Sequence, residues 1–147
     1  MDTQSSPARP FFALISDNAQ SARVLTRMLT AHGAPTVCWL LDPEDAATTL
    51  GDILADPCAR RPGLVIVDLR SSSTREFISR IRRLEGAGDL LIVAMAPSLD
   101  LKGRNVLLEA GAKAVFQRQV ELDPYRREAA SIVSFWVRNE RLNAIGA

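Results

Sequence analysis

The chain has few of the residues that build reactive centres. Two cysteines and one histidine occur in 147 residues, and their spacing indicates neither a metal site nor a disulfide framework. Neither cysteine has a base nearby in the sequence, and the triplet Ser71-Ser72-Ser73 lacks the setting of a nucleophile elbow. His32 precedes Gly33 at a predicted helix end, where a cation is expected for stability alone. We therefore expect that the protein is not an enzyme.

Net charge and long apolar runs are also scarce. The formal net charge is +1, which gives no overall attraction to DNA or to a membrane surface. No apolar run approaches the roughly 18–20 residues of a membrane span, and residues 1–10 have no apolar core of signal-peptide length. We expect a cytoplasmic chain with a disordered lead-in at residues 1–10 and one domain at residues 11–147.

Strand-like and helix-like segments alternate along this domain. Apolar runs predict five strands, at residues 11–15, 36–40, 64–68, 90–96 and 114–117. Apolar residues at helical spacing predict a helix after each strand, the last from Asp123-Pro124 to about Asn143. Five successive βα units imply an α/β, flavodoxin-like (βα)5 fold, which is a doubly wound parallel sheet with strand order 2-1-3-4-5 in a single domain.

The same periodicity predicts which side chains are buried. Arg82 falls outside the apolar face of the third helix. Val106 and Leu107 lie on the inner face of the fourth helix, and Tyr125 and Trp136 on that of the last. We expect these apolar faces to pack on the sheet.

Two acidic residues follow strands at the edge where an open α/β sheet binds ligands. Asp68 ends the apolar run 64–67, and Asp17 follows the first strand. Because the carboxyl ends of parallel strands border the ligand crevice, the two carboxylates are expected to lie close together. Such a pair can hold a hard cation such as Mg²⁺. The alternative is that Asp17 only caps the following helix.

The order of these residues resembles a two-component response-regulator receiver domain of the CheY-like type. The resemblance covers about residues 11–143 and rests on Ser16-Asp17, Asp68, Ala96 and the string 111–118. It implies that Asp68 accepts a phosphoryl group in a bacterial phosphorelay, with a histidine kinase as partner, and that Asp17 and Asp68 bind Mg²⁺. Because the fold uses the whole chain and leaves no DNA-binding output domain, we expect a stand-alone protein that binds other signalling proteins.

Several positions depart from the pattern of that family. Ser16 replaces one of the two acids that hold Mg²⁺, so the metal site is expected to be weak. Ala96 stands at the position of a hydroxyl residue, Arg118 at that of a lysine, and Val115 at that of an aromatic switch residue. These degenerate positions predict an atypical receiver, or pseudo-receiver, in which phosphorylation of Asp68 is weak or lost.

The last predicted helix carries a stripe of polar side chains at spacings of three and four residues. An arginine fork matches phosphate groups and stacks on bases, so the stripe favours cyclic di-GMP as an alternative ligand. The competing interpretation is a solvated polar face, since the chain has no glycine-rich phosphate loop. The candidate nucleotide or anion residues are Arg118, Arg126, Arg127, Arg138 and Arg141.

Phe135 and Val137 flank Trp136 on the same helix, and the three side chains cannot all face one core. A helix that is apolar on more than one side usually buries both sides. We therefore expect Phe135 and Val137 to form an interface, with homodimerisation through the fourth and fifth helices as the simplest outcome.

Overall fold

The computed structural model describes residues 10–70, 73–98 and 100–146, with side chains described up to Leu142. The predicted disordered lead-in lies outside the described residues, except for Pro10, which is exposed. The elements are β1 (Phe11–Ser16), α1 (Ala19–Ala31), β2 (Thr36–Leu40), α2 (Pro43–Ala55), β3 (Leu64–Asp68), α3 (Thr74–Arg82), β4 (Ile92–Ala96), α4 (Leu101–Ala110), β5 (Ala114–Gln117) and α5 (Leu122–Gly146).

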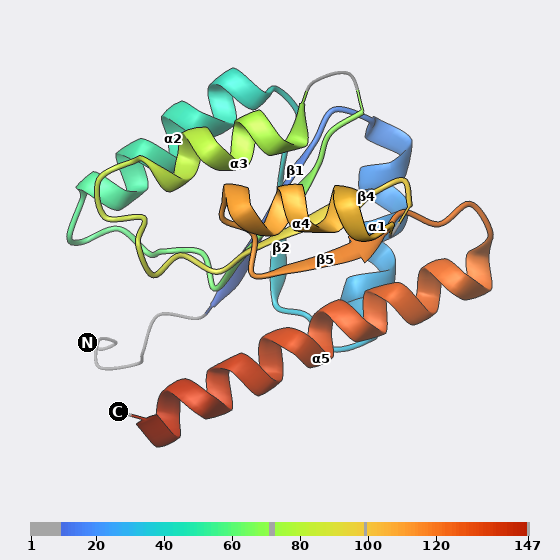
Figure 1. Ribbon diagram of the computed structural model, residues 1–147. Coiled ribbons are helices and arrows are strands. Elements are labelled where there is room, and N and C mark those ends of the chain that lie inside the picture. Colours follow the sequence, from blue (N-terminus) through green and yellow to red (C-terminus); the bar gives the residue numbers. More distant parts are fainter. Residues whose placement is uncertain (1–9, 71–72, 99, 147) are drawn as a thin grey trace.

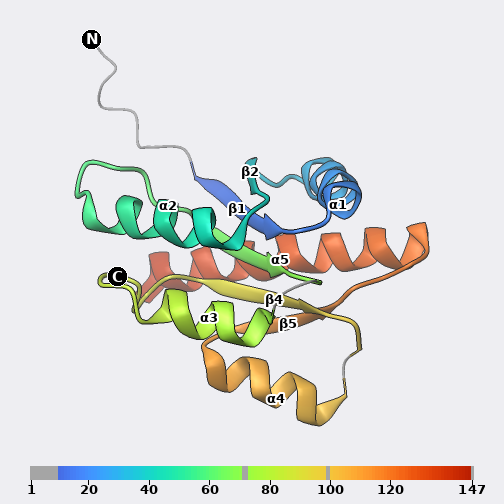
Figure 2. The ribbon, with the colours of Figure 1, turned by 90° about the horizontal axis from the view of Figure 1, so that it is seen from above.

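The strands form one parallel sheet in the order β2-β1-β3-β4-β5. Helices α2, α3 and α4 cover one face of this sheet, and α1 and α5 cover the other (Figures 1 and 2). The predicted fold class and strand order are confirmed. In the described part of the chain, no helix is long and apolar enough to cross a membrane.

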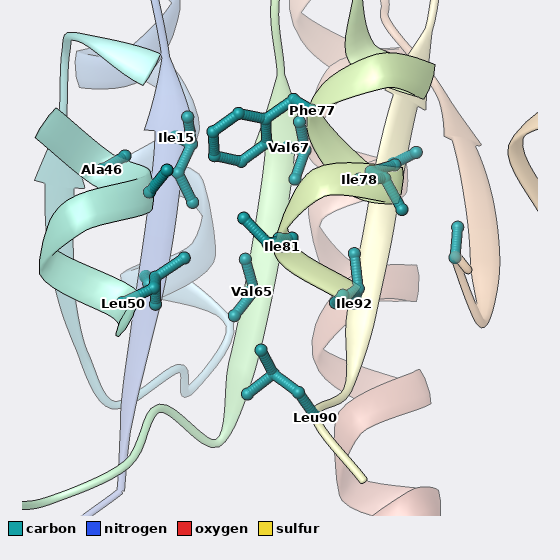
Figure 3. Close-up of a cluster of buried hydrophobic side chains, with 14 of the residues drawn as sticks. Ile15, Ala46, Leu50, Val65, Val67, Phe77, Ile78, Ile81, Leu90 and Ile92 are labelled. Atoms are coloured by element: carbon teal, nitrogen blue, oxygen red, sulfur yellow. The ribbon is translucent and has the colours of Figure 1, made fainter. Parts of the chain in front are cut away.

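The central strand β3 is buried on both faces, because its alternate side chains enter two different apolar clusters. Val65 and Val67 meet Phe77 and Ile81 of α3 in the cluster shown in Figure 3. Ile66 enters the cluster beneath α1 and α5. Each such side chain contributes about 1.5–3 kcal/mol when fully buried. This packing fixes the carboxyl end of β3, where Asp68 lies.

The apolar side of α5 packs beside α1 in the cluster on their shared face of the sheet. Tyr125 is buried as predicted, whereas Trp136 is only partly buried at the edge of the cluster. Its ring meets Phe12 edge to face, with centroids 5.1 Å apart. Trp136 lies one turn beyond the last fully buried residue of α5, Val133, which explains its partial exposure.

Two predictions of burial are wrong. Val106 is 36% exposed, because α4 covers only the β4–β5 end of the sheet and buries Leu107 alone (Figure 2). Arg82 is not a solvated residue of α3. Its guanidinium donates to the carbonyls of Ala87, Leu90 and Gly111 at 2.6–2.8 Å, and so joins the loops at both ends of the β4–α4 unit.

Candidate functional site

Asp68 lies at the carboxyl end of β3 beside Ser16, and it is 1% exposed. Arg118, which follows β5, reaches this carboxylate across the intervening strand β4. Its Nε donates to Oδ1 at 2.8 Å, and its Nη2 lies 2.6 Å from the same oxygen. The arginine side chain is only 14% exposed, so the pair is poorly screened by water. The predicted acceptor carboxylate is therefore held by an internal cation.

The backbone around β5 places Arg118 for this contact. Arg118 N donates to the Ala96 carbonyl at 2.7 Å, and the neighbouring Gln117 N donates to Glu128 of α5 at 2.6 Å. Ala96 carries only a methyl group and lines a small pocket together with Arg118. Nη2 also donates to the Leu69 carbonyl at 3.3 Å. The alanine and the arginine at these two departing positions are thus directly linked.

Two buried polar atoms near this pair have no hydrogen-bond partner among the described residues. They are Asp68 Oδ2 and the hydroxyl of Tyr125. Burial raises the pKa of Tyr125 to about 12, and the charge of Asp68 adds to this effect while Arg70 and Arg118 oppose it. The hydroxyl therefore keeps its proton at neutral pH and is a hydrogen-bond donor without an acceptor.

Asp17 and Ser16 form hydrogen bonds with backbone groups at this edge of the sheet. Asp17 Oδ1 accepts a hydrogen bond from Arg70 N at 2.9 Å, whereas the cap of α1 is Asn18, which accepts from Ser21 N. The alternative prediction that Asp17 caps this helix is therefore wrong. The Ser16 hydroxyl donates to the Asn18 carbonyl and accepts from its N–H, at 3.2 and 3.3 Å.

These contacts compete with a Mg²⁺ ion for the oxygens of the predicted site. A divalent cation needs several oxygen ligands in a near-octahedral arrangement. Arg118 already places a positive charge on Asp68, and Ser16 is engaged with the backbone. Across residues 10–70, 73–98 and 100–146, no group of three or more His, Cys, Asp or Glu side chains is placed to hold a metal. A cation at Asp68 Oδ1 would compete with Arg118 for this oxygen.

The predicted switch position lies in the core. Val115 is buried beneath α4 with Leu107 and offers no aromatic ring that could swing outward. The next residue, Phe116, points to the opposite face and meets Phe135 of α5, with ring centroids 6.2 Å apart. This contact gives Phe135 a partner within its own chain and explains why its ring is half-buried.

The predicted arginine stripe is spread along exposed surface. Two shallow grooves of about 250 and 440 Å³ run between α5 and His32 at the end of α1. Arg126 and Arg127 line the first, and Arg138 and Arg141 the second, together with half-buried Val137. Arg126 pairs with Asp123 at 2.9 Å. Arg118 does not join this stripe, because its guanidinium is used at Asp68.

A separate cleft of about 550 Å³ lies beside the Asp68 site, between the start of α1 and the segment joining β5 to α5. Arg70, Arg118 and Tyr125 line it, and Arg70 Nη2 donates to Ser21 Oγ at 2.6 Å. Sequence reasoning missed this cleft. Arg70 follows β3 by two residues, which was a usable signal, but the helical pattern presented Tyr125 only as a core residue.

Comparisons with known proteins place the fold. No protein-family model matches the sequence, and no curated protein matches it. The phosphorylated cyanobacterial phytochrome response regulator RcpA is similar in structure, with a TM-score of 0.74, 20% identity, and coverage of 88% of this chain and 95% of that one. The Mn²⁺-bound response regulator Rcp1 has a TM-score of 0.72 and 18% identity, with coverage of 87% of this chain and 94% of that one. A response-regulator receiver domain from Rhodospirillum rubrum has a TM-score of 0.73 and 14% identity, with coverage of 86% of this chain and 93% of that one. The chain therefore has the CheY-like receiver fold.

Proposed function

We propose that the protein is an atypical receiver that acts in the cytoplasm as a stand-alone signalling adaptor, with phosphorylation of Asp68 weak or lost. The ion pair between Arg118 and Asp68 carries this proposal. A carboxylate that accepts a phosphoryl group must present an oxygen to the phosphorus. Oδ1 contacts two guanidinium nitrogens and Oδ2 is buried, so neither oxygen is available without rearrangement.

Rearrangement of this pair is costly. Removing one partner of a buried pair typically costs about 3–5 kcal/mol, because the other charge stays buried alone. Fewer groups are present to offset this cost during phosphoryl transfer. Ser16 supplies no second acid for a metal ion, and Ala96 supplies no hydroxyl donor to the phosphate. Our proposal accordingly includes no enzymatic reaction.

Exposed apolar side chains support binding of a protein partner. Leu101 is 73% exposed at the start of α4, and Val120 and Leu122 are 99% and 62% exposed between β5 and α5. Val120 and Leu122 line one cleft, and contiguous exposed apolar surface marks interaction sites more often than scattered apolar residues do. We propose a second copy of the chain as the first occupant of the α4–β5–α5 side, with a signalling protein such as a histidine kinase as the alternative. Light scattering at high concentration decides this, since a strict monomer contradicts the dimer.

Beryllofluoride, a phosphoryl mimic, tests the phosphorylation proposal directly. With Mg²⁺ it should leave the amide chemical shifts of α4, β5 and α5 unchanged in the wild-type protein. Arg118→Lys replaces the fork with a compact ammonium and should restore a response that disappears again with Asp68→Asn. Arg104→Lys, on the exposed side of α4, is the matched control. Widespread shifts in the wild-type protein would overturn the proposal.

A second candidate function is cyclic di-GMP binding in the α1–α5 grooves. The favouring observation is that Arg138, Arg141 and His32 line one groove while Arg127 continues the basic surface into the next. Calorimetric titration with cyclic di-GMP separates the candidates. Micromolar binding that is weakened by Arg138→Ala supports the cyclic di-GMP function. If no heat of binding is detected at micromolar concentration, the adaptor function remains.

A further inference from the structure

The cleft beside the Asp68 site has an unusual combination of charge and burial. Its polar lining includes Ser21, Arg70, Arg118 and Tyr125, and none of its described lining residues is acidic. Its rim is apolar and exposed at Val120 and Leu122. The volume of about 550 Å³ lies in the range of small-molecule sites and exceeds the needs of a single inorganic ion.

The Tyr125 hydroxyl is the strongest sign of a ligand. The side chain is 6% exposed and its hydroxyl has no partner among the described residues. Tyr125 lines the cleft together with Arg70 and Arg118, and the charges of Asp68, Arg70 and Arg118 all act on the pKa of its hydroxyl. A buried polar group without a partner costs about 1–3 kcal/mol. A ligand oxygen that accepts a hydrogen bond from the hydroxyl offsets this cost.

Arg70 supplies a cation that the protein itself does not neutralise. Its guanidinium is held by one hydrogen bond to the Ser21 hydroxyl, and it forms no ion pair with any described residue. Asp17 accepts a hydrogen bond from the backbone N–H of Arg70. The first turn of α1 carries no acidic residue, so the helix end adds positive potential on the same side.

We propose that this cleft binds a small phosphorylated organic ligand without covalent attachment. The phosphate would lie between the Arg70 fork and the first turn of α1, and a small shift of the Tyr125 ring, whose hydroxyl is buried, would bring that hydroxyl to it. An apolar body would cover Val120 and Leu122. An arginine fork and a tyrosine hydroxyl match the oxygens of a phosphate monoester. This proposal does not rest on the adaptor role, and it holds whether or not Asp68 is ever phosphorylated.

Asp68 gives this site a distinctive property. Arg118 separates the cleft from Asp68, and its charge is now neutralised by that carboxylate. Replacing Asp68 with Asn removes the competing anion and leaves Arg118 free to attract the ligand. A noncovalent site therefore binds more tightly in Asp68→Asn, whereas covalent phosphorylation of Asp68 is abolished by the same change.

The probes are phenyl phosphate, inorganic phosphate and benzoate, added to the whole protein without Mg²⁺ and followed through amide chemical shifts. We expect saturable shifts centred on Ser21, Arg70 and Tyr125. Phenyl phosphate should bind most tightly, because it joins the doubly charged head to an apolar body. Absence of saturation by phenyl phosphate at about 10 mM would overturn the proposal, since millimolar affinity is the weakest that a specific site of this kind supports.

Variants locate the binding. Arg70→Gln should weaken phenyl phosphate binding by about tenfold or more, the usual worth of a charge-assisted hydrogen bond. Tyr125→Phe should weaken it by about three- to tenfold, as expected for one hydrogen bond. Arg75→Gln is the control, because Arg75 is an exposed arginine on α3 that does not line this cleft.

Thermal unfolding confirms that each variant is folded before its affinity is compared. Equal affinities for Arg70→Gln and Arg75→Gln would contradict the site, because they indicate diffuse attraction to a basic surface. Loss of binding in Asp68→Asn, together with a requirement for Mg²⁺, would also contradict it and assign the anion to Asp68.

Discussion

Two of the arginine–carboxylate pairs of the protein differ both in geometry and in surroundings. Arg80 and Glu44 join α3 to α2 through two hydrogen bonds of 2.7 and 3.0 Å, and their side chains are 48% and 74% exposed. Arg118 and Asp68 use one carboxylate oxygen and are 14% and 1% exposed. The surface pair has the better fork geometry. Breaking the buried pair nevertheless costs more free energy of unfolding, because the remaining charge would stay buried away from water.

This difference bears on function. A receiver site works as a switch only if its carboxylate can gain and lose a partner at low cost. The sequence predicts such a role for Asp68, whereas the structure holds this side chain like a structural residue. Ala96 and Arg118 are directly linked here, because Arg118 N donates to the Ala96 carbonyl and both residues line one pocket.

The largest expected effect comes from breaking the buried pair. Arg118→Ala should destabilise the protein by about 3–5 kcal/mol, because it leaves the Asp68 carboxylate buried without its cation. Denaturant unfolding measures this change. The double variant Asp68→Ala with Arg118→Ala should recover a substantial part of the loss, and the coupling follows from a double-mutant cycle. A single-variant loss below about 1 kcal/mol would show that the pair behaves as a surface pair.

Arg82 is partly buried, like Arg118 of the buried pair and unlike the exposed Arg80 of the surface pair, and its hydrogen-bond partners are neutral. Burial lowers the pKa of its guanidinium, but three carbonyls accept its hydrogen bonds. Arg82→Met keeps the apolar stem and should cost about 1–3 kcal/mol, the penalty for buried acceptors that lose their donor. Arg83→Met, at the exposed neighbouring position, is the control. Equal losses for the two variants would contradict this assignment.

The fold was predictable because its signals are local. Strands β2, β3 and β5 coincide with the predicted ranges, since their apolar runs are bounded by turn residues. Helix α2 begins at Pro43 after the Asp42 cap, as the sequence indicates. β4 begins two residues later than predicted, at Ile92, because Leu90 and Leu91 are buried in the connection before the strand.

The chemistry of the site was less predictable, because it depends on contacts between distant residues. The resemblance placed Asp68 and Arg118 at corresponding positions of one site, but their direct pairing spans fifty residues and leaves no mark in local periodicity. Arg82 shows the same limitation. Its position on the outer side of α3 predicted exposure, while the length of its side chain lets it reach buried carbonyls.

Tyr125 should show a small effect on stability whose size depends on pH. Its folded pKa of about 12 lies above its ordinary value of 10, so its contribution to stability is complete below pH 10 and is lost as pH rises through about 12. Compared with Tyr125→Phe, the wild-type protein should therefore lose stability across this range. Tyr125 is the single tyrosine of the chain, so its ultraviolet absorbance follows the titration directly. Ionisation at the ordinary pKa would show that the hydroxyl is solvated.

The smallest effect is expected at the surface pair. Arg80 lowers the pKa of Glu44 through its hydrogen bonds and its charge. A lowered folded pKa stabilises the protein above the unfolded value of 4.5, and this contribution is lost as pH falls through the folded pKa. Glu44→Gln should therefore differ from the wild-type protein only at neutral pH, by a shift in Tm close to the error of measurement, and the difference should disappear in acid. Glu85→Gln, which changes the same charge at an exposed position, corrects for net charge. If Glu44→Gln instead lowers Tm as much as Arg118→Ala, then hydrogen-bond geometry rather than burial decides the strength of these pairs, and the account of Asp68 as a locked carboxylate loses its physical basis.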